Sequence, residues 1–116
     1  MPEYRVPEYV ASNARRGLNL REFAGNVTAQ TVREAGRMAD GFVDLDKAVR
    51  MAAWFARHAQ DLDTADADAY LAGERNRPTP GQVAWLLWGG DLSRANRDRA
   101  RRWAARLVER ERNADR

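Results

Sequence analysis

The chain has 116 residues and a formal net charge of +3, with 20 Lys and Arg against 17 Asp and Glu, one His and no Cys. This length suits a single domain, and the lack of cysteine excludes disulfides, thiolate metal sites and cysteine nucleophiles. No apolar run approaches the ~18 residues that a membrane span needs, and the first ten residues lack the features of a secretory signal. We therefore expect a soluble protein without a membrane partner or a targeting segment.

The composition favours helices over strands. Ala is the commonest apolar residue, Ile is absent, and β-branched residues are few. The sequence predicts an all-α fold for residues 1–116, a small bundle of about four to five helices. Residues 8–90 would form its compact part, and residues 91–116 a long, Arg-rich C-terminal helix that is free to protrude.

Turn and capping residues divide the N-terminal half into three helices. Pro7 occupies a first-helical position, and the periodicity of Val10, Ala14 and Leu18 predicts a helix over 8–23 that ends near Gly25. Thr28 caps a predicted helix over 29–40, which Gly41 ends. Asp44 caps a third, which runs to His58 or Ala59. Its expected inward stripe comprises Leu45, Ala48, Val49, Ala52, Phe55 and Ala56.

The C-terminal half begins with an acidic connection over 59–78, to which we assign no function and at most one weak helix, 64–71. Thr79 and Pro80 predict a helix over 80–88 that Gly89 and Gly90 break. Asp91 or Ser93 would then cap the last helix, which extends to about Arg112. Its expected apolar seam, either a docking surface or a face folded onto the other helices, comprises Leu92, Ala95, Trp103, Leu107 and Val108.

Few residues are suited to catalysis or to metal binding. The hydroxyl candidates are Ser12, Ser93 and four Thr, most of them explained as helix caps, and His58 is the only imidazole. The acids of the connection do not keep the spacing of a calcium loop, and no phosphate-binding glycine motif is present. We expect no catalytic residue, no metal site and no cofactor.

The arginines of the last helix are the candidate nucleic-acid contacts. Residues 91–116 carry +4 whereas residues 1–90 carry −1, and Arg99, Arg102, Arg106 and Arg110 share one side of a helix. The alternative is a solvated face that acids within the same helix partly neutralise. For the paired Trp85 and Trp88, core packing is favoured over stacking on bases.

Four blocks of sequence carry a resemblance to a family. NARRGLNLRE (13–22), TVREAGRMADG (31–41), VRMAAWFARH (49–58) and PGQVAWLLWGGD (80–91) occur in this order. Together they resemble a small module of tailed-phage proteins, found in XkdF-type prohead proteases and other head-associated polypeptides. The resemblance spans about residues 13–96. The matching positions that we single out are Arg16, Arg57, His58, Trp85, Trp88, Gly89, Gly90 and Asp91.

The resemblance implies a phage origin and a place in or near the head, without a proteolytic activity. We expect the two glycines to reverse the chain, Asp91 to cap the next helix, and the tryptophans to pack with Phe55 beneath that corner. We expect the polar positions to form a buried ion-pair network with acids such as Glu22 or Asp91, or else to line an anion site. These polar positions are Arg16, Arg50, Arg57 and His58.

Two functions follow as hypotheses. The first is a non-enzymatic minor capsid protein of a tailed bacteriophage, located in the virion head after assembly in the bacterial cytoplasm, with capsid or portal proteins as partners. The alternative is a phage-encoded accessory protein that binds double-stranded DNA through the C-terminal Arg face. A domain of this size with a long charged helix is also a candidate for self-association as a homo-oligomer.

Overall fold

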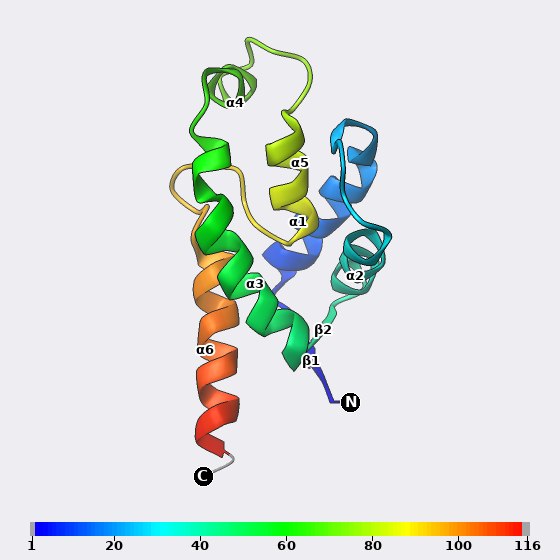
Figure 1. Cartoon of the computed structure of the whole chain (residues 1–116), viewed down its shortest axis with the longest axis vertical. Coiled ribbons are helices and arrows are strands. Elements are labelled where there is room, and N and C mark those ends of the chain that lie inside the picture. Colours follow the sequence, from blue (N-terminus) through cyan, green and yellow to red (C-terminus); the bar gives the residue numbers. More distant parts are fainter. Residues whose placement is uncertain (1, 115–116) are drawn as a thin grey trace.

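The computed structural model describes residues 2–114, which form six α-helices and a small two-stranded sheet (Figure 1). Two short 3₁₀ turns, η1 (Arg21–Phe23) and η2 (Ala59–Leu62), follow the first and third helices. The strands are β1 (Glu3–Arg5) and β2 (Phe42–Asp44). The helices are α1 (Glu8–Asn19), α2 (Ala29–Ala39), α3 (Leu45–His58), α4 (Ala65–Leu71), α5 (Pro80–Leu87) and α6 (Arg99–Ala114).

Side-chain caps begin four of these helices where the sequence predicts them. Thr28 Oγ1 accepts from the Thr31 amide at 3.1 Å, and Asp44 and Thr64 cap α3 and α4 in the same way. Thr79 and Gln82 form a reciprocal capping box at the start of α5. The predicted starts at residues 29, 45 and 80 are confirmed because each depends on contacts only three residues apart.

The sheet is absent from the sequence prediction. β1 pairs with β2 in antiparallel register, with Tyr4 opposite Val43, and the Val6 amide continues the pairing to the Gly41 carbonyl at 2.9 Å. Three-residue strands leave no alternating pattern to read, and the pairing joins segments about 40 residues apart. Gly41, at a φ of 108°, turns the end of α2 directly into β2.

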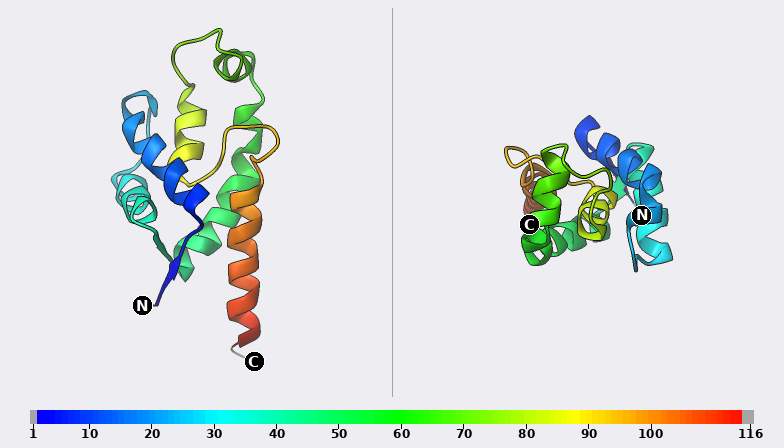
Figure 2. Two further views of the ribbon diagram at one scale, coloured as in Figure 1. Left: turned by 180° about the vertical axis from the view of Figure 1, so that it is seen from behind. Right: turned by 90° about the horizontal axis from the view of Figure 1, so that it is seen from above.

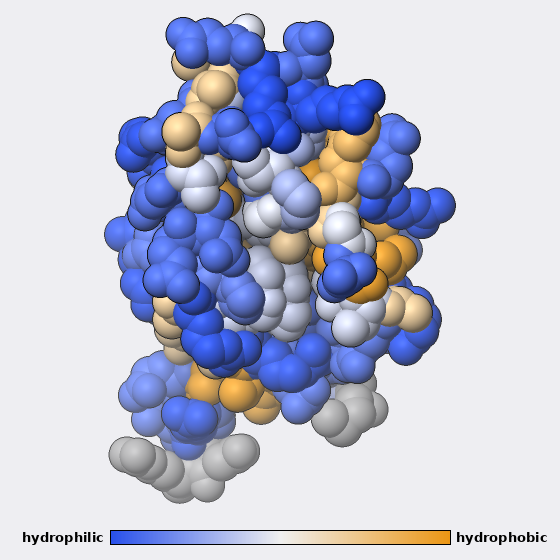
Figure 3. Space-filling model, turned by 45° about the horizontal axis from the view of Figure 1, so that its top comes forward, coloured by the Kyte–Doolittle hydropathy of each residue, from blue (hydrophilic) through white to orange (hydrophobic). Residues whose placement is uncertain are grey.

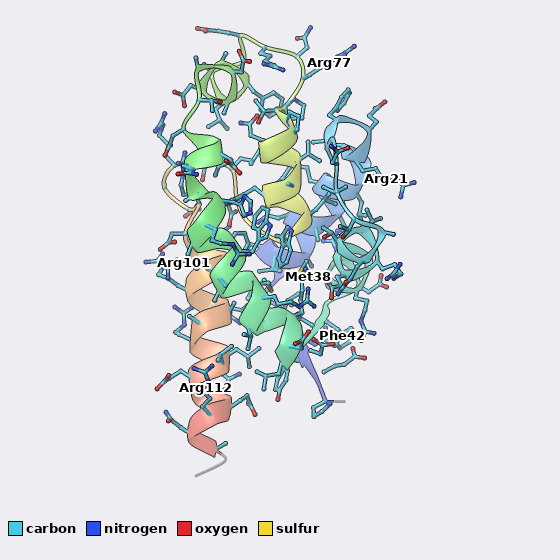
Figure 4. All side chains as sticks on the ribbon, viewed as in Figure 1. Arg21, Met38, Phe42, Arg77, Arg101 and Arg112 are labelled. Carbon is cyan, nitrogen blue, oxygen red and sulfur yellow. The ribbon has the colours of Figure 1, made fainter. Side chains whose placement is uncertain are left out.

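The helices form two groups that share one core. α3 and α6 lie side by side, while α1, α2 and α5 pack together beside them (Figures 1 and 2). Met38, labelled in Figure 4, lies between the groups and is fully buried. The other large side chains that are fully buried include Met51, Phe55, Leu62, Leu86, Leu87 and Leu107.

The last helix begins later than predicted. Residues 91–93 are irregular and residues 94–98 form turns, and α6 starts at Arg99, so neither Asp91 nor Ser93 caps it. Leu92 is buried in the core, and this tertiary contact holds the chain out of helical geometry after α5. Ala95, expected in the apolar seam, is exposed. Leu107 and Val108 are buried where α6 packs on α3, so the seam folds back onto the domain.

Two other helix predictions need correction. The first helix ends at Asn19 and is followed by η1, instead of continuing to residue 23. The buried stripe of α3 is rotated from the predicted one: Val49 is 42% exposed and Ala56 is exposed, whereas Lys47 and Met51 are buried. The core therefore contains a lysine in place of a valine.

Among the described residues, no helix combines the length and apolar character that crossing a bilayer requires.

Candidate functional site

The predicted Arg face lies on the side of α6 that is turned away from α3. The helix buries Ala100, Ala104, Leu107 and Val108, and the arginines at 99, 102, 106 and 110 point away from that stripe because of the helical period. Arg102 and Arg110 are 57% and 70% exposed, and Arg106 is exposed as well. Most of the predicted face is therefore accessible to a partner.

Arg99 differs from the other three. Its Nε and Nη2 donate to the two carboxylate oxygens of Asp91, each at 2.8 Å, and its guanidinium lies 3.9 Å from the centre of the Tyr9 ring. The hydrogen bonds to Asp91 raise the pKa of Arg99 further above its ordinary value. The bidentate pair ties the start of α6 to the segment after α5, and the contact with Tyr9 ties it to α1, so Arg99 has a structural role within the face.

The other three arginines are weakly compensated. Arg102 and Arg110 each approach a carboxylate only at 3.9 Å, from Asp98 and Glu111 respectively. Arg106 has no hydrogen bond or ion pair with any residue that the structure describes. Exposed pairs at this distance contribute little energy. Arg102, Arg106 and Arg110 therefore present three available charges along about 12 Å of helix.

The two glycines after α5 reverse the chain over Trp85 and Phe55 as the sequence predicts, although Asp91 pairs with Arg99 and does not cap a helix there. Gly89 adopts a φ of 93°, and its carbonyl accepts from Asn13 Nδ2 at 3.1 Å. A Cβ on Gly90 would lie 2.3 Å from Trp85 Nε1 and 2.8 Å from Phe55 Cε1. The corner is therefore closed directly over the Trp85 and Phe55 rings, whose centroids are 4.7 Å apart.

Trp88 belongs to an aromatic stack that the sequence does not reveal. Its ring lies parallel to that of Trp54, with centroids 4.8 Å apart and planes within 9°. Trp54 also stacks on His58 at 4.4 Å, and Lys47 Nζ lies 3.4 Å from the centre of the Trp88 ring. Three aromatic rings and an ammonium group thus form a continuous column between α3 and α5.

An ion-pair network flanks this column, but its members differ from those predicted. Glu34 of α2 accepts from Lys47 Nζ at 3.0 Å and from both terminal nitrogens of Arg50, which also pairs with Asp46. Of the residues expected in a buried network, only Arg50 takes part. Glu34 was not anticipated, because nothing local distinguishes it from other acids on α2.

Opposing effects set the protonation of this network. Burial alone would raise the pKa of Glu34, but the hydrogen bond from Arg50 and the charge of Lys47 outweigh it and lower that pKa to about 2. Burial lowers the pKa of Lys47 to about 8, against the opposing effect of Glu34. Both groups are therefore charged near neutral pH, and the buried ammonium depends on Glu34 as its counter-ion.

The remaining predicted residues lie apart from the network. Arg16 is exposed and donates to the Tyr70 hydroxyl at 3.1 Å, and Arg57 is exposed without an ion pair in the described chain. His58 Nδ1 is 2.9 Å from Asp61 Oδ2. Asp91 is half-buried and paired with Arg99. The predicted network with Glu22 or Asp91 therefore does not form, and these residues enclose no common anion site.

The sequence does contain a signal for Lys47. It is the chain's single lysine and lies four and eight residues before Met51 and Phe55, on one stripe of α3. A charge at such a position predicts a buried partner on a neighbouring helix. The identity of Glu34 as that partner depends on how α2 packs against α3.

The hydroxyl and imidazole groups show no catalytic arrangement among residues 2–114. Thr28, Thr64 and Thr79 cap helices, and Thr31 is bonded to Thr28. His58 contacts Asp61 and Trp54, and no serine or threonine hydroxyl is bonded to it among the described residues. No group of three or more His, Asp or Glu within this range is placed to hold a metal ion.

Comparison of the chain with protein-family models, with curated proteins and with solved structures finds no match.

Proposed function

We propose that the protein is a non-enzymatic, head-associated component of a tailed bacteriophage. The observation that carries the proposal is the convergence of the four resembling sequence blocks on one structural centre. Asn13 of the first block donates to the Gly89 carbonyl of the last, and Phe55 of the third packs against Trp85. A Cβ on Gly89 would lie 3.5 Å from Sδ of Met38, which belongs to the second block. The four blocks therefore meet at one corner of the fold, which supports treating them as one module.

The imidazole and the threonine hydroxyls are already hydrogen-bonded or stacked within the domain, which supports a binding role over an enzymatic one. The chain's one imidazole is stacked on Trp54 and bonded to Asp61, and the threonine hydroxyls serve caps or each other. A hydroxyl nucleophile needs a base within hydrogen-bond reach, and no hydroxyl–imidazole pair is formed among residues 2–114. The feature that the described residues offer to a partner is the exposed, positively charged side of α6.

Peptide mass spectrometry of purified particles of the encoding phage tests this function. We expect peptides of this chain at a constant ratio to the major shell protein, retained after the DNA has been digested and the particles washed in high salt. Their absence from intact particles, when they are abundant in the infected cell, would contradict the proposal.

A second candidate function, binding of double-stranded DNA, is favoured by the three exposed guanidinium groups of Arg102, Arg106 and Arg110. Neutralising three phosphates gives a salt slope of about −2.7, or about a 40-fold loss of affinity between 50 and 200 mM salt. Both functions fit a protein inside the capsid that lies against packaged DNA.

Charge-removing variants test the DNA hypothesis better than truncation, because removal of α6 would uncover the buried side of α3. We expect R102Q/R106Q/R110Q to lose most of the affinity and the salt dependence. The matched control is R21Q/R33Q/R57Q, which changes three exposed arginines outside α6 by the same charge. Equal binding by the two triple variants would assign any binding to net charge and refute the role of this face.

A further inference from the structure

The acidic connection between α3 and α5 concentrates negative charge on one part of the surface. Residues 59–78 contain five acids and two arginines, a net charge of −3, whereas the whole chain carries +3. The helix of this connection, α4, lies at the end of the molecule beyond α3 (Figure 1), and Figure 3 shows that end turned forward and covered mainly by hydrophilic residues. A segment of this charge repels DNA and attracts the arginines that DNA would use.

Two acids of the connection are paired with arginines that lead into α6. Asp68 Oδ1 accepts from Arg94 Nη2 at 2.5 Å, and Asp63 Oδ1 accepts from Arg97 Nη1 at 2.8 Å. Both arginines belong to the turns immediately before α6, which curve around the outer side of its first residues (Figures 1 and 2). The connection therefore neutralises two positive charges at the N-terminal end of the Arg face.

These two arginines are close enough to the exposed part of the Arg face for one duplex to contact both. The turns are compact, because the Asn96 amide bonds the Ser93 carbonyl and the Arg99 amide bonds the Asn96 carbonyl, each at 3.2 Å. At roughly 2 Å per residue in such turns, Arg94 lies within about 16 Å of Arg102 along the chain. A DNA strand carries a phosphate about every 3.4 Å of its axis, so a duplex on Arg102 has phosphates within that distance.

The ion pair with Asp63 leaves Arg97 incompletely satisfied. Its Nε and Nη2 atoms are buried and have no acceptor among the described residues, because Asp63 engages Nη1 alone. A buried donor without an acceptor destabilises the state that contains it. A phosphate offers several oxygens and binds a guanidinium in bidentate geometry, so it would satisfy Arg97 better than Asp63 does.

The helix that carries Asp68 is held to the domain by few contacts. Ala67 is the only buried residue of the seven in α4, and its carbonyl accepts from Gln82 Nε2 at 3.1 Å. The half-buried Tyr70 adds one hydrogen bond through its hydroxyl. The pair between Asp68 and Arg94 is exposed on both sides, so it contributes little energy. Segments with so few buried contacts open at a low cost in free energy.

We propose that Arg94 and Arg97 are two further contacts for double-stranded DNA, which the acidic connection masks in the free protein. The inference rests on the proposed binding of DNA by the three exposed arginines of α6. While Asp63 and Asp68 hold the two masked arginines, the chain meets DNA through those three alone. Release of the connection adds two phosphate contacts and removes a nearby negative charge, so the affinity for DNA rises.

Binding of a labelled duplex by the native full chain and by D63N/D68N, measured by fluorescence anisotropy at several salt concentrations, tests the inference. Both aspartates are exposed, and asparagine keeps the size of each side chain while it removes the charge that holds the arginines. We expect D63N/D68N to bind at least about tenfold tighter at about 50 mM salt. Its salt slope should change from about −2.7 to about −4.5, because five phosphates are neutralised instead of three.

Two controls separate release of the arginines from a change in net charge. E22Q/D40N neutralises two exposed acids that have no ion pair among the described residues, and its slope should stay near about −2.7. Addition of R94Q/R97Q to the first variant restores the native net charge, and the slope should return to the same value. Circular dichroism verifies that each variant is folded.

The outcomes distinguish this inference from the proposed binding of DNA. Equal affinity and slope for the native chain and D63N/D68N, or an equal gain in E22Q/D40N, would overturn the inference and leave DNA binding by α6 in place. Failure of both the native chain and D63N/D68N to bind at low salt would overturn the inference together with the proposed binding of DNA.

Discussion

The buried lysine makes the stability of this fold depend on one carboxylate. Lys47 is 3% exposed in its side chain, and its direct ion-pair partner among the described residues is Glu34. Glu34→Gln keeps the size of the side chain but leaves the ammonium without its counter-ion. Breaking a buried pair from one side costs about 3 to 5 kcal/mol, and we expect about 3 because the Trp88 ring still faces the ammonium.

A double-mutant cycle separates this cost from ordinary packing. Lys47→Met replaces the buried charge with an apolar chain of similar length, and we expect stability within about 1 kcal/mol of the native protein, or higher. In that background Glu34→Gln should cost no more than about 1 kcal/mol, because the remaining contact with Arg50 is partly exposed. The coupling between the two sites is therefore about 2 kcal/mol.

Urea unfolding followed by circular dichroism measures all four proteins. The Glu34→Gln variant should also melt about 12 °C lower for a loss of 3 kcal/mol. A single-variant cost below about 1 kcal/mol would refute the reasoning, as would a double variant that is no more stable than Glu34→Gln alone.

Four further outcomes are expected from urea unfolding. Gly90→Ala should cost at least about 2 kcal/mol, because its Cβ would lie 2.3 Å from Trp85 Nε1; a native midpoint would contradict that close approach. Gly36→Ala has open space and a helical position, so stability should rise by about 0.5 to 1 kcal/mol, and a loss would count against it. Thr79→Ala should cost about 1 kcal/mol by removing the α5 cap, and an unchanged midpoint would show that the cap does not stabilise the fold. Because the pKa of Glu34 is lowered to about 2, its contribution is complete above pH 4.5 and is lost as the pH falls toward 2, by up to about 3 kcal/mol; in Glu34→Gln that part of the acid dependence should vanish.

The parts of the fold that local contacts determine could be predicted from the sequence. Thr28, Asp44 and Thr79 mark helix starts because each side chain bonds an amide three residues away. Gly89 and Gly90 mark the corner for a similar reason. Such contacts can be predicted from a short stretch of sequence because both partners lie within it.

The parts that depend on packing between helices could not be predicted. Leu92 has the spacing of a helical seam, yet its burial in the core delays the start of α6 to Arg99. Lys47 is buried on α3 and Val49 is exposed, the reverse of the prediction, because Glu34 of another helix neutralises the lysine. In the candidate site, the helical period predicts that Arg102 and Arg110 lie on an exposed face, and they do. The pairing of Arg99 with Asp91 could not be predicted, because it depends on the irregular turn between these two residues.

The contacts between the first and last helices bear on when this chain can fold during its synthesis. Tyr9 near the start of α1 meets Arg99 at the start of α6, and Leu107 completes the cover of α3. A nascent chain that ends before residue 99 lacks this cover, so its apolar surface stays open until α6 has been synthesised. This domain therefore completes its fold only after α6 has been synthesised, and until then α3 exposes apolar surface on which other chains can aggregate.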